Sequence, residues 1–174
     1  MKTKSASQKN TVVSVVMGSD SDLPVMVEAT KILEDFGIPH ELYLTSAHRT
    51  PERTTTFAQG ASERGVKIII VGAGAAAHLA GVIASQTQLP VIGVPIDATS
   101  LQGLDALLST VQMPGGIPVA TMAIGLAGAK NAALYAVRIL ALEDKKISTK
   151  LNSYIKRMNE NVEKKQEALS CRKS

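Results

Sequence analysis

Aromatic side chains are scarce in this chain of 174 residues, which has no tryptophan, three tyrosines and two phenylalanines. Proteins that stack bases or sugar rings on flat side chains rely on clusters of such residues. We therefore expect neither an aromatic platform for nucleic acid nor a sugar-stacking groove.

Long apolar runs and cysteines are also missing. No stretch approaches the roughly 20 consecutive apolar residues of a membrane-spanning helix, because Lys, Asp, Gln or Asn interrupts each run. The single cysteine, Cys171, cannot form an internal disulfide, and no Cys/His cluster has zinc-site spacing. These absences predict a cytoplasmic protein of the reducing cytosol that binds neither membrane nor metal.

The net charge of +4 comes from the ends of the chain. Residues 1–10 carry three lysines and no acid, and residues 143–174 carry nine basic and five acidic side chains. The body, residues 11–142, holds seven basic and ten acidic side chains. A duplex-binding protein would carry a basic face on its folded body, so nucleic-acid binding is not expected. Residues 1–10 lack the apolar middle of a signal peptide and are expected to form a disordered arm.

Short β-branched runs alternate with helical stretches of ten or more residues, which predicts an α/β protein with a parallel sheet covered on both faces. The expected strands are Val12–Val16, Glu41–Thr45, Lys67–Val71, Val91–Val94 and Pro118–Ile124. Asp22 as N-cap, Pro24 in the first turn and Gly37 as the stop mark the first helix. Thr50, Pro51 and Glu52 open the second in the same way.

Two further helices are expected near the C-terminus. Residues 127–142 are rich in alanine and poor in charge, which predicts a helix buried on most sides, with a neighbouring subunit as part of its cover. Residues 147–169 carry an apolar stripe at 3–4 spacing. We therefore divide the chain into an arm (1–10), an α/β catalytic domain (11–142) and a C-terminal helix and tail (143–174) that packs on the same or a neighbouring subunit.

Ligands of open parallel sheets bind beyond the carboxyl ends of the strands, where three loops stand out. The first is Gly18-Ser19-Asp20-Ser21-Asp22. Its serines and the free amides at the helix start could hold an anion, and Asp22 could bind ribose hydroxyls. On the motif alone, an ordinary Ser/Asp-rich turn that caps a helix is the commoner structure.

The second loop is Ser46-Ala47-His48-Arg49-Thr50-Pro51. Arginine offers a rigid fork of donors for phosphate, and histidine both takes and gives a proton near neutral pH. The alternative is a surface loop with two solvated side chains. His40 stands at the start of a strand, at the opposite end of the sheet, and is expected to be structural or solvated.

The third loop runs from Gly72 to Gly81 and is built almost entirely of Gly and Ala around His78. Such small residues let the backbone approach a flat ligand closely. The loop has neither the spacing of a dinucleotide fingerprint nor that of a Walker loop. Tight helix–strand packing would also explain the small residues, but it would not explain His78.

Together, GSDSD, SAHRTP and GAGAAAHLAG, followed by LPVIGVP and VQMPGGIPVATMAIG, resemble the class I N5-carboxyaminoimidazole ribonucleotide mutases of purine (IMP) biosynthesis, the family of the phosphoribosylaminoimidazole carboxylase catalytic subunit. The resemblance covers roughly residues 12–160. It implies a flavodoxin-like three-layer α/β/α subunit with five strands, a homo-octamer with sites near subunit contacts, and a C-terminal helix packed on a neighbour. It also implies functional coupling to an ATP-dependent carboxylating synthetase.

The resemblance assigns site residues by motif position. His48 matches the proton-shuttling histidine of the family. The positions that match its substrate-binding residues are Ser19, Ser21, Asp22, Ser46, Ala47, Arg49, Gly74, Ala77, His78 and Leu79. His78 would either orient the carboxylate of the substrate or simply shape the loop, and we favour orientation. The implied reaction moves a carboxyl group from an exocyclic nitrogen to a ring carbon through CO2, and it needs no metal, flavin or ATP as cofactor.

Two positions depart from the family's third loop, which usually reads GAGGAAHLPGM. Ala75 replaces a glycine, which would matter if the backbone there needs a positive φ, and Ala80 replaces a proline. The class II enzymes, which carboxylate aminoimidazole ribonucleotide directly with CO2, are the main alternative, but they typically carry a lysine where Arg49 stands. A flavodoxin-like module that holds a nucleotide without chemistry is the alternative of another class.

Overall fold

The computed structural model describes residues 11–170, and the N-terminal arm and Cys171 lie outside this range. The chain divides into two compact units, one reaching to Ala136 and the other starting at Val137. Helix α5 (Gly125–Ala141) continues across this division. None of the helices within residues 11–170 is both long enough and apolar enough to cross a bilayer.

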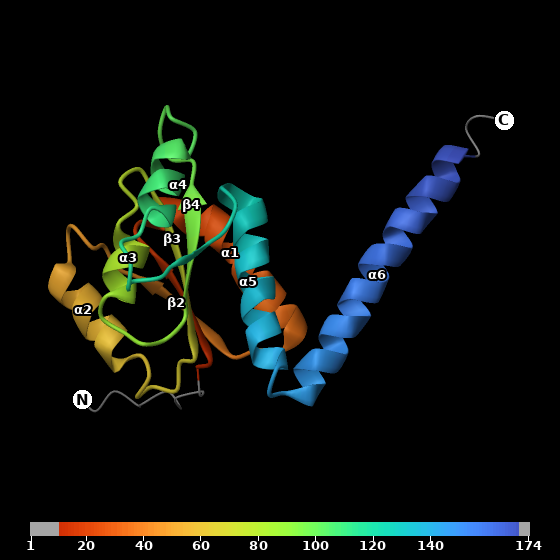
Figure 1. Ribbon diagram of the computed structural model, residues 1–174, viewed down its shortest axis with the longest axis horizontal. Coiled ribbons are helices and arrows are strands. Elements are labelled where there is room, and N and C mark those ends of the chain that lie inside the picture. Colours follow the sequence, from red (N-terminus) through yellow and green to blue (C-terminus); the bar gives the residue numbers. More distant parts are fainter. Residues whose placement is uncertain (1–10, 171–174) are drawn as a thin grey trace, which may run out of the picture. The chain divides into compact units, whose positions relative to one another are not determined.

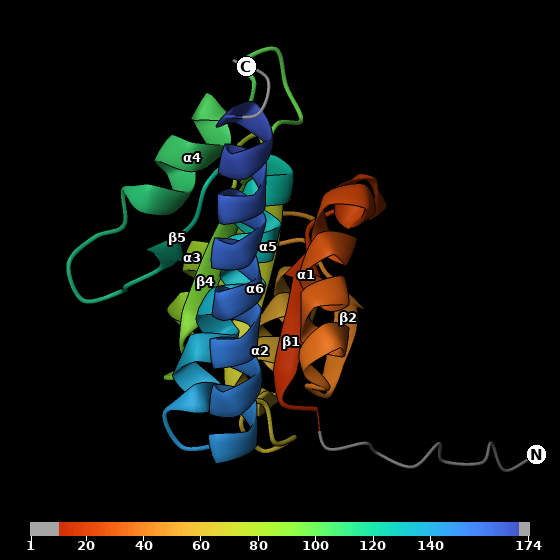
Figure 2. The same cartoon turned by 90° about the vertical axis from the view of Figure 1, so that its right-hand side faces the viewer.

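The first unit is built on a five-stranded sheet in which every neighbouring pair is parallel. Its order is β2-β1-β3-β4-β5, so β2 and β5 are the edges (Figure 2). The strands are β1 (Val13–Met17), β2 (His40–Leu44), β3 (Ile68–Gly74), β4 (Val91–Ile96) and β5 (Ala120–Thr121). Helices α1 (Leu23–Phe36) and α5 lie on one face, and α2 (Pro51–Gly60) and α3 (Leu79–Ala84) lie on the other (Figure 1). The expected α/β/α flavodoxin-like fold is confirmed.

Strand β3 is buried on both faces, as its continuous apolar run predicts. Ile69, Val71 and Ala73 pack in one core cluster with Phe57 and Ala58 of α2. Ile68 and Ile70, which point to the opposite face, are also fully buried. The central strand thus holds both helical layers in place and gives its carboxyl end a fixed position.

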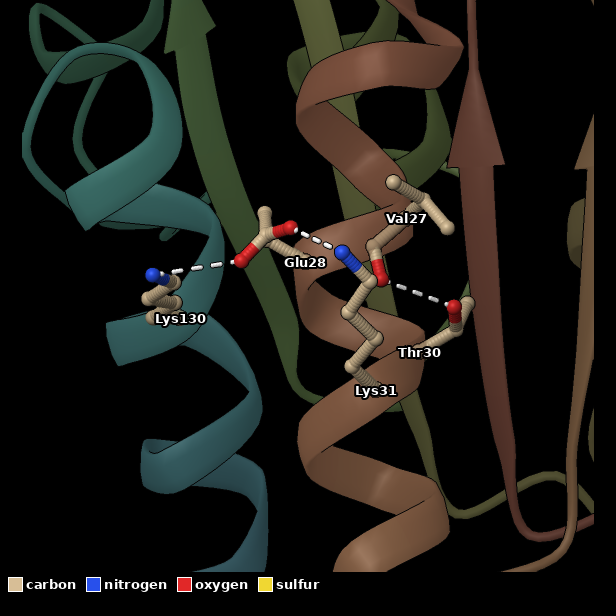
Figure 3. Close-up of polar contacts among 5 residues, drawn as sticks. All are labelled: Val27, Glu28, Thr30, Lys31 and Lys130. Atoms are coloured by element: carbon tan, nitrogen blue, oxygen red, sulfur yellow. Dashed lines mark hydrogen bonds and ion pairs between the residues drawn. The ribbon is translucent and has the colours of Figure 1, made fainter.

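Glu28 links α1 and α5, the two helices on the face of the sheet opposite α2 and α3 (Figure 3). It lies on α1 and forms ion pairs with Lys31 on the same helix and with Lys130 on α5, at 3.2 Å for Lys130. These lysines lower the pKa of the Glu28 carboxyl. The contact joins α1 to the part of α5 that belongs to the first unit.

One predicted strand is wrong in length, and two predicted N-cap residues are right in position but make no capping contact. Strand β5 spans only Ala120–Thr121, where we expected Pro118–Ile124, because it pairs with β4 alone and only through Ile92 and Gly93. Asp22 and Thr50 stand at the N-cap positions of α1 and α2, but neither side chain makes a capping hydrogen bond. Their oxygens are engaged within the loops described below. The stop at Gly37 is correct, since this residue adopts the left-handed conformation (φ +70°).

The remaining helices are η1 (Asp20–Asp22), α4 (Leu104–Val111) and α6 (Lys145–Ser170). Helix α6 belongs to the second unit and contains no buried residue. Four apolar side chains of α4 and the turn before it, Leu101, Leu104, Leu108 and Val111, are about half exposed. The boundary that we expect between residues 142 and 143 stays a prediction.

Candidate active site

A pocket of about 360 Å³ lies beyond the carboxyl ends of β1, β2, β3 and β4. Ligand pockets in proteins usually measure about 300–1,000 Å³. In this sheet order, chain connections leave to opposite faces from β1 and β3, and ligands bind at such a switch point. The lining residues are Gly18, Ser19, Ser21, Asp22, Ser46, Ala47, His48, Arg49, Ala73, Gly74, Ala75, Ala76, His78, Leu79 and Ala98.

The first loop is held by its own side chains. The carboxylate of Asp22 accepts a hydrogen bond of 3.0 Å from the amide of Ser19, while the hydroxyl of Ser21 donates to that of Ser19 at 2.9 Å. The amides of Gly18, Ser21 and Asp22 also have acceptors within the protein. Four amides of the loop, those of Gly18, Ser19, Ser21 and Asp22, are therefore already engaged within the protein, and anion binding at this helix start stays a prediction.

Asp22 is buried, with 4% of its surface exposed. Burial raises the pKa of its carboxyl above the ordinary value of 3.8, and the nearby charge of Asp20 acts in the same direction. Hydrogen bonds from the amides of Ser19 and Gly18 and the charge of Arg49 oppose this rise. Its carboxyl thus stabilises the first loop through the hydrogen bond from Ser19, and it also lines the pocket.

A chain of hydroxyl groups fixes the second loop. The hydroxyl of Thr45 lies 2.8 Å from that of Thr54 and 3.2 Å from that of Thr50. Thr50 in turn accepts from the amide of Ser46 at 3.0 Å and donates to the carbonyl of Ser46 at 3.1 Å. Because Thr45 and Thr54 are almost fully buried, the loop that carries His48 and Arg49 is anchored to hydrogen-bonded hydroxyl groups inside the protein.

Arg49 joins the second loop to the first. Its Nη2 donates a hydrogen bond of 3.1 Å to the carbonyl of Gly18, and its Nε lies 3.5 Å from the hydroxyl of Ser46. Guanidinium carries five N–H donors, so further donors remain for a ligand. The pocket thus carries groups suited to phosphate oxygens, namely those of Arg49, Ser19 and Ser21.

The third loop forms a wall of glycine and alanine in which His78 and Leu79 are the only long side chains. Ala75 has φ +53°, a left-handed conformation that non-glycine residues rarely adopt. A side chain at Gly74 would place its Cβ 2.5 Å from the Cβ of Ala98, so the glycine is required for close approach to the loop after β4. The small residues thus serve packing, backbone conformation and the pocket surface together.

The two histidines of the pocket contact each other. The Nε2 of His48 lies 2.9 Å from the Nδ1 of His78, and the rings are nearly perpendicular, at 83°. His48 follows β2 and His78 follows β3, and β1 lies between these strands in the sheet. The two histidines are therefore 30 residues apart in the sequence, and the strands that precede their loops are not adjacent in the sheet.

The structure brings together ten of the eleven candidate site residues. Ala77 is the exception, because it is 1% exposed and packs in the core cluster beneath the loop. His40 lies at the start of β2, where its Nδ1 is 2.9 Å from the carbonyl of Ile38, away from the pocket. Ala98 was missed, although its position after β4 at the same sheet edge could have indicated it. Within residues 11–170, no group of three or more His, Cys, Asp or Glu side chains is arranged to hold a metal ion.

Residues 12–161 match the family described as AIR carboxylase. The chain belongs to the AIR carboxylase family. The N5-carboxyaminoimidazole ribonucleotide mutase of Pyrococcus horikoshii is 60% identical to it over 158 residues, which are 91% of this chain and 88% of that protein. The corresponding mutase of Thermotoga maritima is 54% identical over 157 residues, covering 90% of this chain and 91% of that protein.

A solved structure has the same fold. The crystal structure of PurE from Treponema denticola superposes with a TM-score of 0.82 at 29% identity, covering 91% of this chain and 98% of that chain. The likeness therefore extends over nearly the whole chain in both sequence and structure.

Proposed function

We propose that this chain is an isomerase of purine biosynthesis that converts N5-carboxyaminoimidazole ribonucleotide to 4-carboxy-5-aminoimidazole ribonucleotide. The observation that carries the proposal is the meeting of His48, Arg49 and the serines of the first loop in one pocket. The 60% and 54% identity to relatives named for this mutase reaction supports it.

The substrate is anchored by its phosphate. Arg49, Ser19 and Ser21 bind the phosphate oxygens through charge-assisted and hydroxyl hydrogen bonds. Asp22 binds the ribose hydroxyls, since its carboxylate would repel phosphate. The backbone and methyl groups of the third loop lie against the flat imidazole, and His78 contacts the carboxylate of the substrate.

His48 transfers the proton in both halves of the reaction. When the carbamate C–N bond breaks, the nitrogen keeps the bonding electrons and receives a proton from His48, and CO2 leaves. The electron-rich ring carbon then attacks CO2 and forms the new C–C bond. Neutral His48 removes the proton from that carbon, which restores the aromatic ring. His48 thus regains the proton that it gave, and the CO2 that left the nitrogen ends on the ring carbon. Histidine suits both steps because it titrates near neutral pH.

Confinement of CO2 supplies much of the rate. A gas molecule retained beside the ring carbon reacts as if it were part of the same molecule, and effective molarities in such cases reach about 10⁵ M or more. Gly74, Ala75 and Ala76 belong to the apolar part of the wall that retains it. The protein works in the cytoplasm, where a carboxylating synthetase that uses ATP supplies the carbamate.

The protein acts as a homo-oligomer, an octamer by resemblance. The apolar side chains of α4 and of the stripe on α6 support this proposal, since Leu104, Met158 and Val162 are 53%, 43% and 64% exposed in the single chain. The C-terminal helix α6 (Lys145–Ser170) packs on the same or a neighbouring copy. Light scattering coupled to gel filtration tests this assembly, and a monomer at micromolar concentration would contradict it.

The activity is tested by ultraviolet spectroscopy. The protein is mixed with N5-carboxyaminoimidazole ribonucleotide, and conversion to the C4-carboxylated isomer is followed. A parallel reaction contains aminoimidazole ribonucleotide and bicarbonate. We expect rapid conversion only in the first reaction, and its loss in His48→Asn with nucleotide binding retained. Rapid conversion in the second reaction would identify a direct carboxylase, and no conversion in either would leave a binding module.

A further inference from the structure

His48 and His78 share one hydrogen bond, and only one of the two rings can donate it. The atoms involved are Nε2 of His48 and Nδ1 of His78, 2.9 Å apart. A neutral imidazole has one N–H and one free acceptor nitrogen. The direction of the shared bond therefore decides which nitrogen of His48 is left to react.

The two directions have opposite consequences. If His78 donates through Nδ1, the Nε2 of neutral His48 is an acceptor already in use and its Nδ1 carries hydrogen. That form of His48 cannot remove a proton from anything else. If His48 donates through Nε2–H, its Nδ1 is a free base. No protein group within residues 11–170 makes a hydrogen bond to this Nδ1, and His48 lines the pocket.

We propose that His78 is a positioning residue, which accepts the Nε2–H of His48 and so makes Nδ1 of His48 the nitrogen that gives and takes the proton. This inference rests on the proposed function, because only a reaction that uses neutral His48 as a base requires the free Nδ1. The Nε2–H of His78 is then directed outward and can donate to the carboxylate of the substrate. Hydrogen bonds would run from that carboxylate through both rings to the reacting nitrogen.

Both proton transfers take place at Nδ1 of His48. Protonated His48 gives the hydrogen on Nδ1 to the departing nitrogen as the C–N bond breaks, and its Nε2–H stays bonded to His78. The freed Nδ1 then takes the hydrogen of the ring carbon after the C–C bond has formed. The other charged groups that line the pocket, Asp22 and Arg49, make no hydrogen bond to either ring and are not needed for these transfers.

Three substitutions of His78 separate its two nitrogens. The amide oxygen of asparagine can replace the acceptor Nδ1, glutamine reaches outward and can replace the donor Nε2–H, and leucine replaces neither. We expect kcat to fall by about 100-fold or more in His78→Leu and His78→Gln, the range of a general acid–base contribution. His78→Asn should keep kcat within about tenfold of wild type. KM should rise in His78→Asn and His78→Leu, but less in His78→Gln. His40→Asn, the third histidine of the chain, is the matched control and should keep both constants.

Equal kcat values in His78→Asn and His78→Leu, or an unchanged kcat in His78→Gln, would overturn the proposal. A second measurement needs neither substrate nor turnover. In ¹⁵N spectra of the wild-type protein above neutral pH, His48 should be in the Nε2–H tautomer, with that hydrogen protected from exchange and exposed again in His78→Leu. The Nδ1–H tautomer would contradict the proposal even in a fully active enzyme. Absence of isomerase activity with the expected tautomer would contradict the proposed function instead.

Discussion

The guanidinium of Arg49 donates a hydrogen bond of 3.1 Å to the backbone carbonyl of Gly18. The two residues follow neighbouring strands, β2 and β1, so this bond ties two of the three pocket loops together. The cation is thereby held beside Ser19 and Ser21 before any ligand binds. A preformed group of donors of this kind loses little conformational freedom when it binds an anion.

Replacing Arg49 by alanine should weaken nucleotide binding more than folding. A hydrogen bond to a charged group contributes about 1.5–3 kcal/mol, which predicts a Kd that rises by about 10–150-fold. Titration calorimetry with aminoimidazole ribonucleotide measures this change. The matched nucleoside, which has no phosphate, should bind both proteins equally.

Arg53→Ala is the control for this experiment. Arg53 lies on α2 and contacts the hydroxyl of Tyr43, outside the pocket. Its loss should leave the Kd within about twofold. An equal loss of affinity in both variants would show that general charge, and not the position of Arg49, attracts the nucleotide.

The buried carboxyl of Asp22 predicts a pH dependence of stability. Because its pKa is raised above 3.8 in the folded state, the folded protein holds more protons than the unfolded chain between pH 3.8 and the folded pKa. The contribution of this group to the free energy of unfolding therefore falls as pH rises through that window, and it is constant below and above it. Asp22→Asn removes the titration.

Urea denaturation of wild type and Asp22→Asn from pH 3.5 to 7 tests this sign. The wild-type free energy of unfolding minus that of Asp22→Asn should decrease as pH rises from 3.8. Asp35→Asn, which changes an exposed carboxyl on α1, controls for the loss of one negative charge. A difference that increases with pH would mean that the amide of Ser19 outweighs burial.

Thr54→Val should destabilise the second loop. Valine has the shape of threonine but lacks the hydroxyl that lies 2.8 Å from Thr45, and Thr54 is fully buried. A hydrogen-bonding group left with a poorer partner in a buried site costs about 1–3 kcal/mol. Chemical denaturation measures the loss. Thr56→Val, on the exposed side of the same helix, should change stability by less than about 0.5 kcal/mol.

Gly74→Ala should disturb the contact between the loops after β3 and β4. The new Cβ would stand 2.5 Å from the Cβ of Ala98 and 3.2 Å from the carbonyl of Ile96. Relief requires a backbone shift, which costs about 1–3 kcal/mol and moves the pocket wall. Thermal unfolding and nucleotide affinity should both decrease. Gly115→Ala, with no atom within 4 Å of its Cβ, should leave both unchanged.

The sequence predicted the arrangement of the site better than its contacts. Parallel strands end at one edge of a sheet, so the loops after β1, β2 and β3 were expected to meet, and they do. The alternation of apolar runs and the signals at Pro24 and Gly37 also placed β3 and α1 closely.

Contacts within the loops depend on rotamers and backbone angles that no sequence pattern specifies. Asp22 was expected to cap α1, yet it turns back to Ser19. The hydrogen bond between His48 and His78 arises only from the three-dimensional course of two loops. Ala75 replaces a usual glycine, and only the structure shows that its φ is +53°. Strand β5 was expected to be longer because β-branched residues favour strands even where no second partner strand is present.

The place of β1 between β2 and β3 limits how the first loop can change length. His48 and His78 contact each other although β1 lies between the strands that precede their loops. Gly18, the residue after β1, accepts a hydrogen bond from Arg49 through its carbonyl. An insertion between Met17 and Asp22 would lengthen the loop that follows β1, the strand between those that lead to His48 and His78. Homologous chains that keep both histidines are therefore expected to tolerate insertions elsewhere, such as around Gly115, but none in this short segment.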